Sequence, residues 1–345
     1  MRAAGEESVN LLSIFGRCIS AKSTIPLKRM AIYNLYTRFT TNDFNEILDP
    51  NTQSEITVVN SMGSDPATVF TDDSWRVHGV HPTAHNLKMI RTDNADKEGA
   101  IVMGKFTGLE RVYIVSTRRG NGSSASKPNS TAATPTTPST MTPGMCSGVT
   151  SANGTPNNMT DHRCRSIGSD YLAVIQTNHR TMRHLLLSDR WILSDDALFR
   201  LCQSCRDLEQ LGFACAIPPL ESLRQVLTLV PKLWAVRLLF RPGTDSSDKL
   251  DTMDPEMHAF AIGTEFWRPE YKNIRYVGFG DDLVFKLGDV YFPPQDKESK
   301  VNGHENSMNA KRAGPIRKVE LVSRESVKDI EIWGLDTTEF DPTFP

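Results

Sequence analysis

A short pattern of apolar positions recurs along the chain: an apolar residue is followed three residues later by a second, and two residues after that by a third. Because the last two positions are two residues apart, they lie on one face of a short strand. The pattern therefore predicts a series of short strands that each bury one face. The copies end at Ile32, Thr92, Ile114, Leu187, Phe213, Leu238, Phe279 and Leu321. A degenerate copy, with Gln53 in the first position, ends at Val58.

Helical spacing of apolar residues fills several of the intervals between these copies. Residues 197–206 place apolar side chains at positions i, i+3, i+4 and i+7, as one face of a helix requires. Residues 220–230 show the same spacing up to Pro231, which ends a helix. Stretches at 171–175 and 257–266 predict two more helices. The chain therefore alternates strands with helices.

The distance between copies indicates a structural repeat. Leu87 and Leu109 are 22 residues apart, and Met182 and Leu208 are 26 apart. A strand-plus-helix unit of about 20–29 residues is typical of the leucine-rich repeat. We therefore predict an α/β fold, a leucine-rich-repeat-like solenoid with irregular repeats. Its curved parallel sheet lies on the concave side and its helices on the convex side.

A closed α/β domain with a doubly wound sheet is the alternative to this solenoid. Strands of such a sheet are buried on both faces and form continuous apolar runs. The strands predicted here alternate instead, with Arg, Lys, Glu and Tyr between the apolar positions. One buried and one exposed face favours the solenoid.

Two polar tracts divide the chain. Residues 117–166 are rich in Ser, Thr, Pro, Gly and Asn, which predicts a disordered insertion because such a tract buries too little apolar surface. Residues 293–315 are rich in Lys, Asn, Glu and Gly, which predicts a mobile polar loop. The remaining parts are an N-terminal helix with the first repeats at 1–116, central repeats at 167–292, and a C-terminal strand and cap at 316–345.

The overall charge excludes some classes of partner. The formal net charge is −2, which gives no general preference for nucleic acid or an anionic membrane. No apolar run reaches the roughly 20 residues that span a bilayer, and the polar, acidic N-terminus lacks a secretory signal. We expect a cytoplasmic or nuclear protein, and we expect its six cysteines to be free thiols.

Two groups of residues have the spacing of metal ligands. His78, His81 and His85 lie close in sequence, but Pro82 prevents the helix that would align them. Cys202 and Cys205 form a single Cys-x-x-Cys within the predicted helix 197–206, without a second pair, which favours buried core thiols. We predict neither a metal nor a cofactor, and the histidine loop remains the basis for an alternative metal-binding or enzymatic function.

No catalytic group stands out among the remaining polar residues. Asp195 and Asp196 precede a predicted helix and are interpreted as its N-terminal cap and dipole partners. Asp281 and Asp282 follow a glycine in a predicted turn, and Gly278 belongs to a turn rather than a phosphate loop. Because no nucleophile, base and orienting group occur together, we predict a protein that is not an enzyme. Several Thr-Pro dipeptides in the insertion are candidates for phosphorylation.

The residues between the apolar strand positions should form the functional surface. If the apolar positions face the core, these residues project from the concave face of the sheet. They form a basic row dotted with tyrosines, and Arg and Tyr are common in protein-binding hot spots. The predicted partner-binding residues are Arg29, Tyr33, Arg91, Arg111, Tyr113, His184, Arg237, Tyr276 and Lys318. The predicted partner is a protein segment that is acidic or phosphorylated.

Two blocks of the chain are similar to a known family. Residues 196–211, and residues 327–334 together with Glu339, Phe340 and Asp341, resemble the leucine-rich-repeat region of fungal F-box-type proteins. The resemblance implies a substrate receptor of an SCF-type ubiquitin ligase. Residues 1–26 carry no F-box signal, so a cullin adaptor is expected as a partner only if an F-box lies N-terminal to this sequence. A scaffold without a defined ligand is the further alternative.

Overall fold

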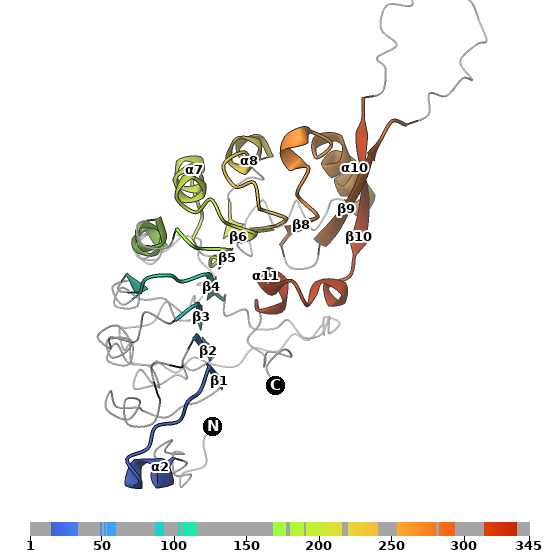
Figure 1. Cartoon of the computed structure of the whole chain (residues 1–345). Coiled ribbons are helices and arrows are strands. Elements are labelled where there is room, and N and C mark those ends of the chain that lie inside the picture. The colour runs from blue at the N-terminus through green and yellow to red at the C-terminus, as the bar shows by residue number, and fades with distance from the viewer. Residues whose placement is uncertain are drawn as a thin grey trace, which may run out of the picture.

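The computed structural model contains one ten-stranded sheet in which strands adjacent in sequence are adjacent in space (Figure 1). The structure describes residues 15–33, 49, 52, 54–59, 87–92, 103–104, 106–115, 168–176, 180–189, 191–215, 220–240, 254–280, 283–293 and 314–336. The first eight strands are parallel, and the last two pair antiparallel at one edge. The predicted α/β class with a mostly parallel sheet is therefore confirmed.

The parallel strands are short, as the sequence pattern predicts. They are β1 Arg29–Tyr33, β2 Glu55–Val59, β3 Met89–Thr92, β4 Arg111–Ile114, β5 His184–Leu186, β6 Gln210–Ala214, β7 Ala235–Leu239 and β8 Tyr276–Phe279. The degenerate copy ending at Val58 forms β2, which pairs with both β1 and β3.

The register of the sheet aligns equivalent positions into rows across the strands. One row runs through Arg29, Glu55, Met89, Arg111, His184, Gln210, Ala235 and Tyr276. The next row on the same face runs through Ala31, Thr57, Arg91, Tyr113, Leu186, Gly212, Arg237 and Gly278. Because side chains alternate along a strand, both rows project from one face, as predicted.

Helices pack on the opposite face of the sheet. They are residues 168–176, α7 Asp195–Ser204, α8 Leu220–Leu227, α10 Pro255–Glu265 and the short η2 Pro269–Tyr271 (Figure 1). Their apolar faces join the inward strand residues in one core, which includes Leu201 from α7 and Leu211 from β6. The four predicted helices are confirmed. At the N-terminus of the described chain, α2 Gly16–Ser20 packs partly against this core.

The cap of α7 differs from the prediction. Ser194 is the N-cap, and its side-chain oxygen accepts a hydrogen bond from the Ala197 amide at 3.3 Å. Asp195 and Asp196 lie in the first helical turn instead. There their carboxylates still interact favourably with the positive end of the helix dipole.

The last two strands depart from the predicted parallel repeat. β9 Leu283–Tyr291 pairs antiparallel with β8, and β10 Ile316–Val322 pairs antiparallel with β9. Only three residues separate β8 from β9, with Gly280 at a φ of 63°, and a connection this short can only reverse the chain. Lys318 therefore lies at an irregularity of an antiparallel strand, outside the row of parallel strands.

The antiparallel pair returns the chain to the sheet. After β10, the chain forms η3 Arg324–Val327 and α11 Glu331–Gly334, which lie on the face opposite to the helical layer. We call residues 323–336 the C-terminal segment. The sequence predicted a terminal cap in this region, whereas the segment lies over the middle of the sheet (Figure 1). Within the described residues, no helix has the length and apolar character needed to cross a membrane.

Candidate binding face

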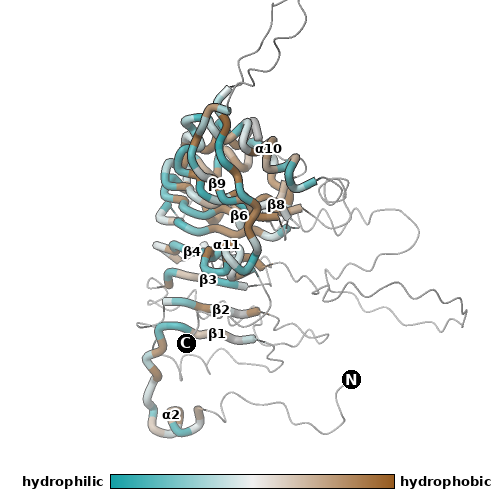
Figure 2. The backbone as a smooth tube through the Cα atoms, turned by 90° about the vertical axis from the view of Figure 1, so that its right-hand side faces the viewer, coloured by the Kyte–Doolittle hydropathy of each residue, from teal (hydrophilic) through white to brown (hydrophobic). Residues whose placement is uncertain are grey.

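The C-terminal segment covers the sheet face that carries the predicted basic row. Figure 2 looks from this side, with α11 in front of the central strands. Val327, Ile332 and Trp333 from the segment are buried together with Tyr113 and Leu186 from the strands. We call the covered surface the binding face. It holds a short peptide that belongs to the same chain.

One acidic residue of the segment is bound by three side chains from β4 and β5. The carboxylate of Glu331 accepts a hydrogen bond from the Tyr113 hydroxyl and pairs with His184 Nδ1. Its other oxygen lies 3.0 Å from Arg111 Nη1. Arg111 is held in place by Glu55 on β2, at 2.6 Å. Glu331 therefore places its negative charge between Arg111 and His184 on the sheet.

The charge of Glu331 is stabilised despite partial burial. Burial alone would raise its pKa, but the hydrogen bond and charge of His184, together with Tyr113 and Arg111, lower the pKa to about 2. Burial and the Glu331 carboxylate raise the pKa of Tyr113 well above its ordinary value, so this hydroxyl remains a donor. The cluster is built to hold a carboxylate.

A second acidic residue pairs with a fully buried arginine. Arg237 Nη1 lies 2.9 Å from the carboxylate of Asp336, and the two side chains are 0% and 3% exposed. The same nitrogen donates to the Ile332 carbonyl at 2.7 Å, and Nε donates to the Gly280 carbonyl at 3.1 Å. An isolated buried charge is very costly, so Arg237 requires this set of acceptors.

Other side chains of the sheet form hydrogen bonds with main-chain groups of the segment. Arg91 is also fully buried, and its Nε donates to the Leu335 carbonyl at 2.9 Å, while Nη1 donates to the Tyr33 hydroxyl at 2.5 Å. The amide of Ile332 donates to Gln210 Oε1 at 3.2 Å. These hydrogen bonds do not depend on the side chains of Leu335 and Ile332, because they involve main-chain groups.

An aromatic residue fills a slot made by a missing side chain. Trp333 is 1% exposed and lies over Gly278 on β8. A Cβ atom at position 278 would lie 2.6 Å from Trp333 Cζ2, closer than real contacts allow. Gly278 is therefore part of the binding face and lies within β8, not in a turn. The slot is filled by the Trp333 indole.

The structure places the predicted partner-binding residues as follows. Arg91, Arg111, Tyr113, His184 and Arg237 contact the C-terminal segment. Tyr33 bonds to Arg91, Arg29 pairs with Glu55 at 2.9 Å, and Tyr276 packs beside the segment. Lys318 is exposed on β10, outside this set.

The C-terminal segment of the same chain covers this row, which was not predicted. The reason is the reversal at β9 and β10, which the repeat pattern does not contain. The acidic and aromatic groups that complete the face, Glu331, Trp333 and Asp336, were not predicted. The spacing of two acids around one tryptophan is the only signal that could have indicated them.

The residues considered as possible metal ligands or reactive groups are either buried or lie outside the described residues. Cys202, Cys205 and Cys215 are buried free thiols, and burial raises the pKa of each to about 12, so they stay protonated. No group of three or more His, Cys, Asp or Glu within the described ranges could hold a metal ion. Several predictions lie outside the described residues: those on His78, His81, His85, Cys146, Cys164, Asp281, Asp282, residues 117–166 and residues 294–313.

Comparison with known proteins adds no assignment. The chain matches no family model, and no curated protein shows significant similarity to it.

Proposed function

We propose that the chain is a non-enzymatic protein-recognition module that binds an acidic segment of another protein across the binding face. The observation that carries the proposal is the way the face holds Glu331 and Asp336 with cationic side chains while Trp333 fills the slot over Gly278. Basic residues that pair with acids, next to an aromatic pocket, are typical of peptide recognition.

The arrangement of strands supports a leucine-rich-repeat-like solenoid as the scaffold. Each of the first seven strands pairs with the next one in the chain, in parallel and without a register shift. Stacked repeats produce this order because each unit contacts only its neighbours. The resulting surface presents a long row of equivalent positions to one extended ligand.

The C-terminal segment indicates what a partner must carry. Its two acids are separated by four residues, with an aromatic residue two positions after the first. Arg91 and Arg237 bind carbonyl groups that any peptide has. We therefore propose a partner segment with an acid, a large apolar residue and a second acid at this spacing.

A partner must compete with the chain's own segment. A tethered segment has an effective concentration in the millimolar range, which weakens the apparent affinity of any ligand added in trans. The hold of the segment is not optimal, because the indole Nε1–H of Trp333 is buried without a hydrogen-bond partner among the described residues. An unsatisfied donor of this kind costs about 1–3 kcal/mol.

The test is the binding of a fluorescent peptide spanning residues 323–336 to the full chain. Trp333→Ala in the chain removes a buried aromatic residue, worth about 3–5 kcal/mol, and should free the face. We expect this variant to bind the peptide at least about tenfold more tightly than the wild type. Glu325→Ala is the matched control, since Glu325 is 80% exposed and pairs only with Lys328 within the described chain.

The outcome separates recognition from a purely structural cap. A folded Trp333→Ala chain that binds no peptide would show that the face does not accept a ligand in trans. Adding Arg237→Met to this variant should weaken peptide binding again, because it removes the partner of Asp336.

A narrower version of the proposal makes the chain a substrate receptor of an SCF-type ubiquitin ligase. It is supported by the resemblance to F-box-type repeats and by the sequential order of the strands. Co-precipitation of a cullin adaptor with the protein tests it. If the protein binds the peptide but no cullin adaptor, the proposal of a recognition module stands and the proposal of a ligase receptor is contradicted.

A further inference from the structure

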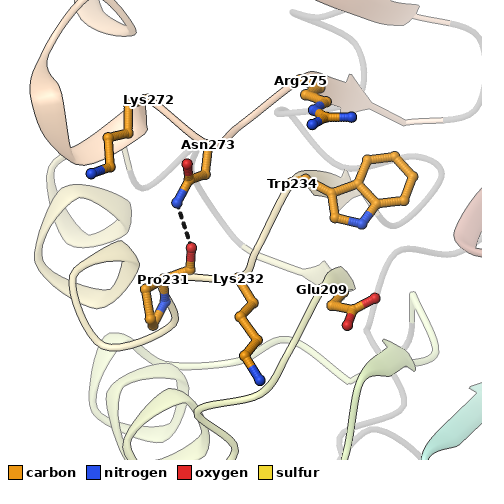
Figure 3. A pocket seen from close by; sticks show the side chains of 7 residues that line it. All are labelled: Glu209, Pro231, Lys232, Trp234, Lys272, Asn273 and Arg275. Atoms are coloured by element: carbon orange, nitrogen blue, oxygen red, sulfur yellow. Dashed lines mark hydrogen bonds between the residues drawn. The ribbon is translucent and has the colours of Figure 1, made fainter.

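Beside the C-terminal segment, the loops that lead into β6, β7 and β8 enclose a hollow of about 400 Å³ (Figure 3). We call it the rim hollow. Its volume falls within the range of about 300–1,000 Å³ that is usual for ligand sites. Trp234, in its wall, packs against the same apolar cluster as the C-terminal segment. The hollow is thus a part of the recognition surface that the segment leaves open.

The walls of the rim hollow are held by a regular ladder. The amide of Trp234 donates to the Glu209 carbonyl at 2.9 Å, and the amide of Arg275 donates to the Trp234 carbonyl at 2.7 Å. Asn273 braces two loops by donating from its side chain to the Pro231 carbonyl at 2.5 Å (Figure 3). The side chains of these positions are therefore spaced at about 4.8 Å, the distance between strands.

Positive charge dominates the rim hollow although the chain as a whole has a net charge of −2. Lys232, Lys272 and Arg275 line it and are exposed. Within the part of the chain that the structure describes, neither Lys272 nor Arg275 has an acidic partner. A local excess of charge of this kind selects an anionic ligand.

The acidic groups nearby do not cancel this charge. Glu209 lines the hollow, but it pairs with Arg183 at 2.7 Å and lies 3.6 Å from His184 Nε2. Lys232 pairs with Asp207 at 2.6 Å, and both side chains are about half exposed, so this ion pair is weak and can be exchanged for a ligand. Among the described residues, the hollow therefore presents two cations without an acidic partner, Lys272 and Arg275, and one exchangeable cation, Lys232.

An aromatic surface accompanies the charge. Trp234 is partly exposed, and its ring packs edge-on against Tyr276 with centroids 6.1 Å apart. This contact fixes the indole, so an apolar group can pack on it at little entropic cost. Arg275 offers a planar guanidinium, which binds carboxylate or phosphate through two parallel hydrogen bonds.

We propose that the rim hollow binds an oxyanion-bearing side chain of a protein partner, foremost a phosphorylated serine or threonine, with an apolar neighbour packed on Trp234. The inference rests on the proposed function, because it adds a second contact point to the same recognition surface. Phosphate and carboxylate share the chemistry that Arg275 and Lys272 recognise, and the experiment distinguishes them.

The experiment uses the full chain and three degenerate peptide libraries. One has phosphothreonine fixed at its centre, the second has glutamate there, and the third has threonine. We expect the chain to retain the phosphothreonine library at least about tenfold above the threonine library, as one bidentate charged hydrogen-bond pair allows. Preferential retention of the glutamate library would assign the site to carboxylates.

Variants connect retention to the hollow. The double change Lys272→Glu and Arg275→Glu should abolish the preference, while the matched control Arg17→Glu, an exposed residue of α2, should not. Equal loss in both would show nonspecific electrostatic attraction and overturn the proposal. Equal retention of all three libraries by the wild type would overturn it as well. Trp234→Ala should keep the phosphate preference and lose the enrichment of apolar neighbours; unchanged enrichment would remove the role of the indole.

Failure here is distinguishable from failure of the proposed function. The peptide of residues 323–336 contacts the binding face and not Lys272 or Arg275, so the double charge reversal should leave its binding to the Trp333→Ala chain intact. If the wild type shows no preference for the phosphothreonine library while the Trp333→Ala chain still binds the peptide, only the proposal for the rim hollow is contradicted.

Discussion

The ion pair between Arg237 and Asp336 makes the most demanding prediction about the folded state. Asp336→Asn keeps the shape of the side chain and removes its charge. Arg237, which is fully buried, would then lose its charged acceptor and keep its hydrogen bonds to the carbonyl groups of Ile332 and Gly280. Breaking a buried pair by removing one partner costs about 3–5 kcal/mol. We expect about 3 kcal/mol, the lower end, because the two carbonyls remain.

Urea unfolding followed by fluorescence measures this change. With a slope of about 2–3 kcal/mol per molar urea, a loss of 3 kcal/mol lowers the midpoint by about 1 M. The matched control is Asp329→Asn, which removes the same charge from an exposed position of the same segment and should change the free energy of unfolding by less than about 0.5 kcal/mol.

A double substitution refines the test. Arg237→Met combined with Asp336→Leu should recover much of the lost stability, because an apolar pair avoids the desolvation of two charges. The reasoning would be refuted if Asp336→Asn destabilised the protein no more than Asp329→Asn. It would also fail if the two changes were additive. The double variant would then be less stable than the wild type by the sum of the losses measured for Arg237→Met and Asp336→Leu alone.

Two further predictions concern the binding face, and a third concerns the core between the sheet and the helices. The pKa of Glu331 falls from 4.5 to about 2 on folding, which stabilises the charged form by on the order of 3 kcal/mol; this contribution is complete above pH 4.5 and is lost as the pH falls through 2. The difference in unfolding free energy between the wild type and Glu331→Gln should therefore be present at pH 7 and disappear near pH 2. Gly278→Ala should displace Trp333 and lower stability by about 1–3 kcal/mol, measured by urea unfolding, whereas an unchanged midpoint would mean that the slot is not tight. Cys202 and Cys215 should react with a thiol reagent only at the rate of unfolding, and rapid modification at neutral pH would contradict their burial.

The sequence predicts the parallel part of the sheet because each strand carries its own local signal. The alternation around Leu211 and Phe213 is sufficient to assign both the strand and its buried face, and the register follows from equivalent positions in successive copies. The helix of residues 195–204 is equally local, since its apolar face repeats at helical spacing. The sequence around each of these elements is therefore sufficient to predict it.

The covering of the binding face could not be predicted in the same way. It depends on the reversal of the chain after β8, where β9 has no matching repeat copy in the sequence. The contact between Arg91 and the Leu335 carbonyl joins residues 244 positions apart and uses a main-chain group, which leaves no trace in the residue pattern. The sequence therefore indicated the basic row, but not that Glu331 and Asp336 of the same chain pair with it.

Hydrogen exchange of the C-terminal segment tests the central proposal most directly. The chain is labelled with ¹⁵N, an unlabelled peptide of residues 323–336 is added, and the amide of Ile332, which donates to Gln210, is followed. If the face is a recognition surface, saturating peptide displaces the segment, and this amide exchanges faster while amides of α7 are unaffected. If the amide of Ile332 remains protected until the whole protein unfolds, the segment is a permanent part of the core and the proposed recognition function is contradicted.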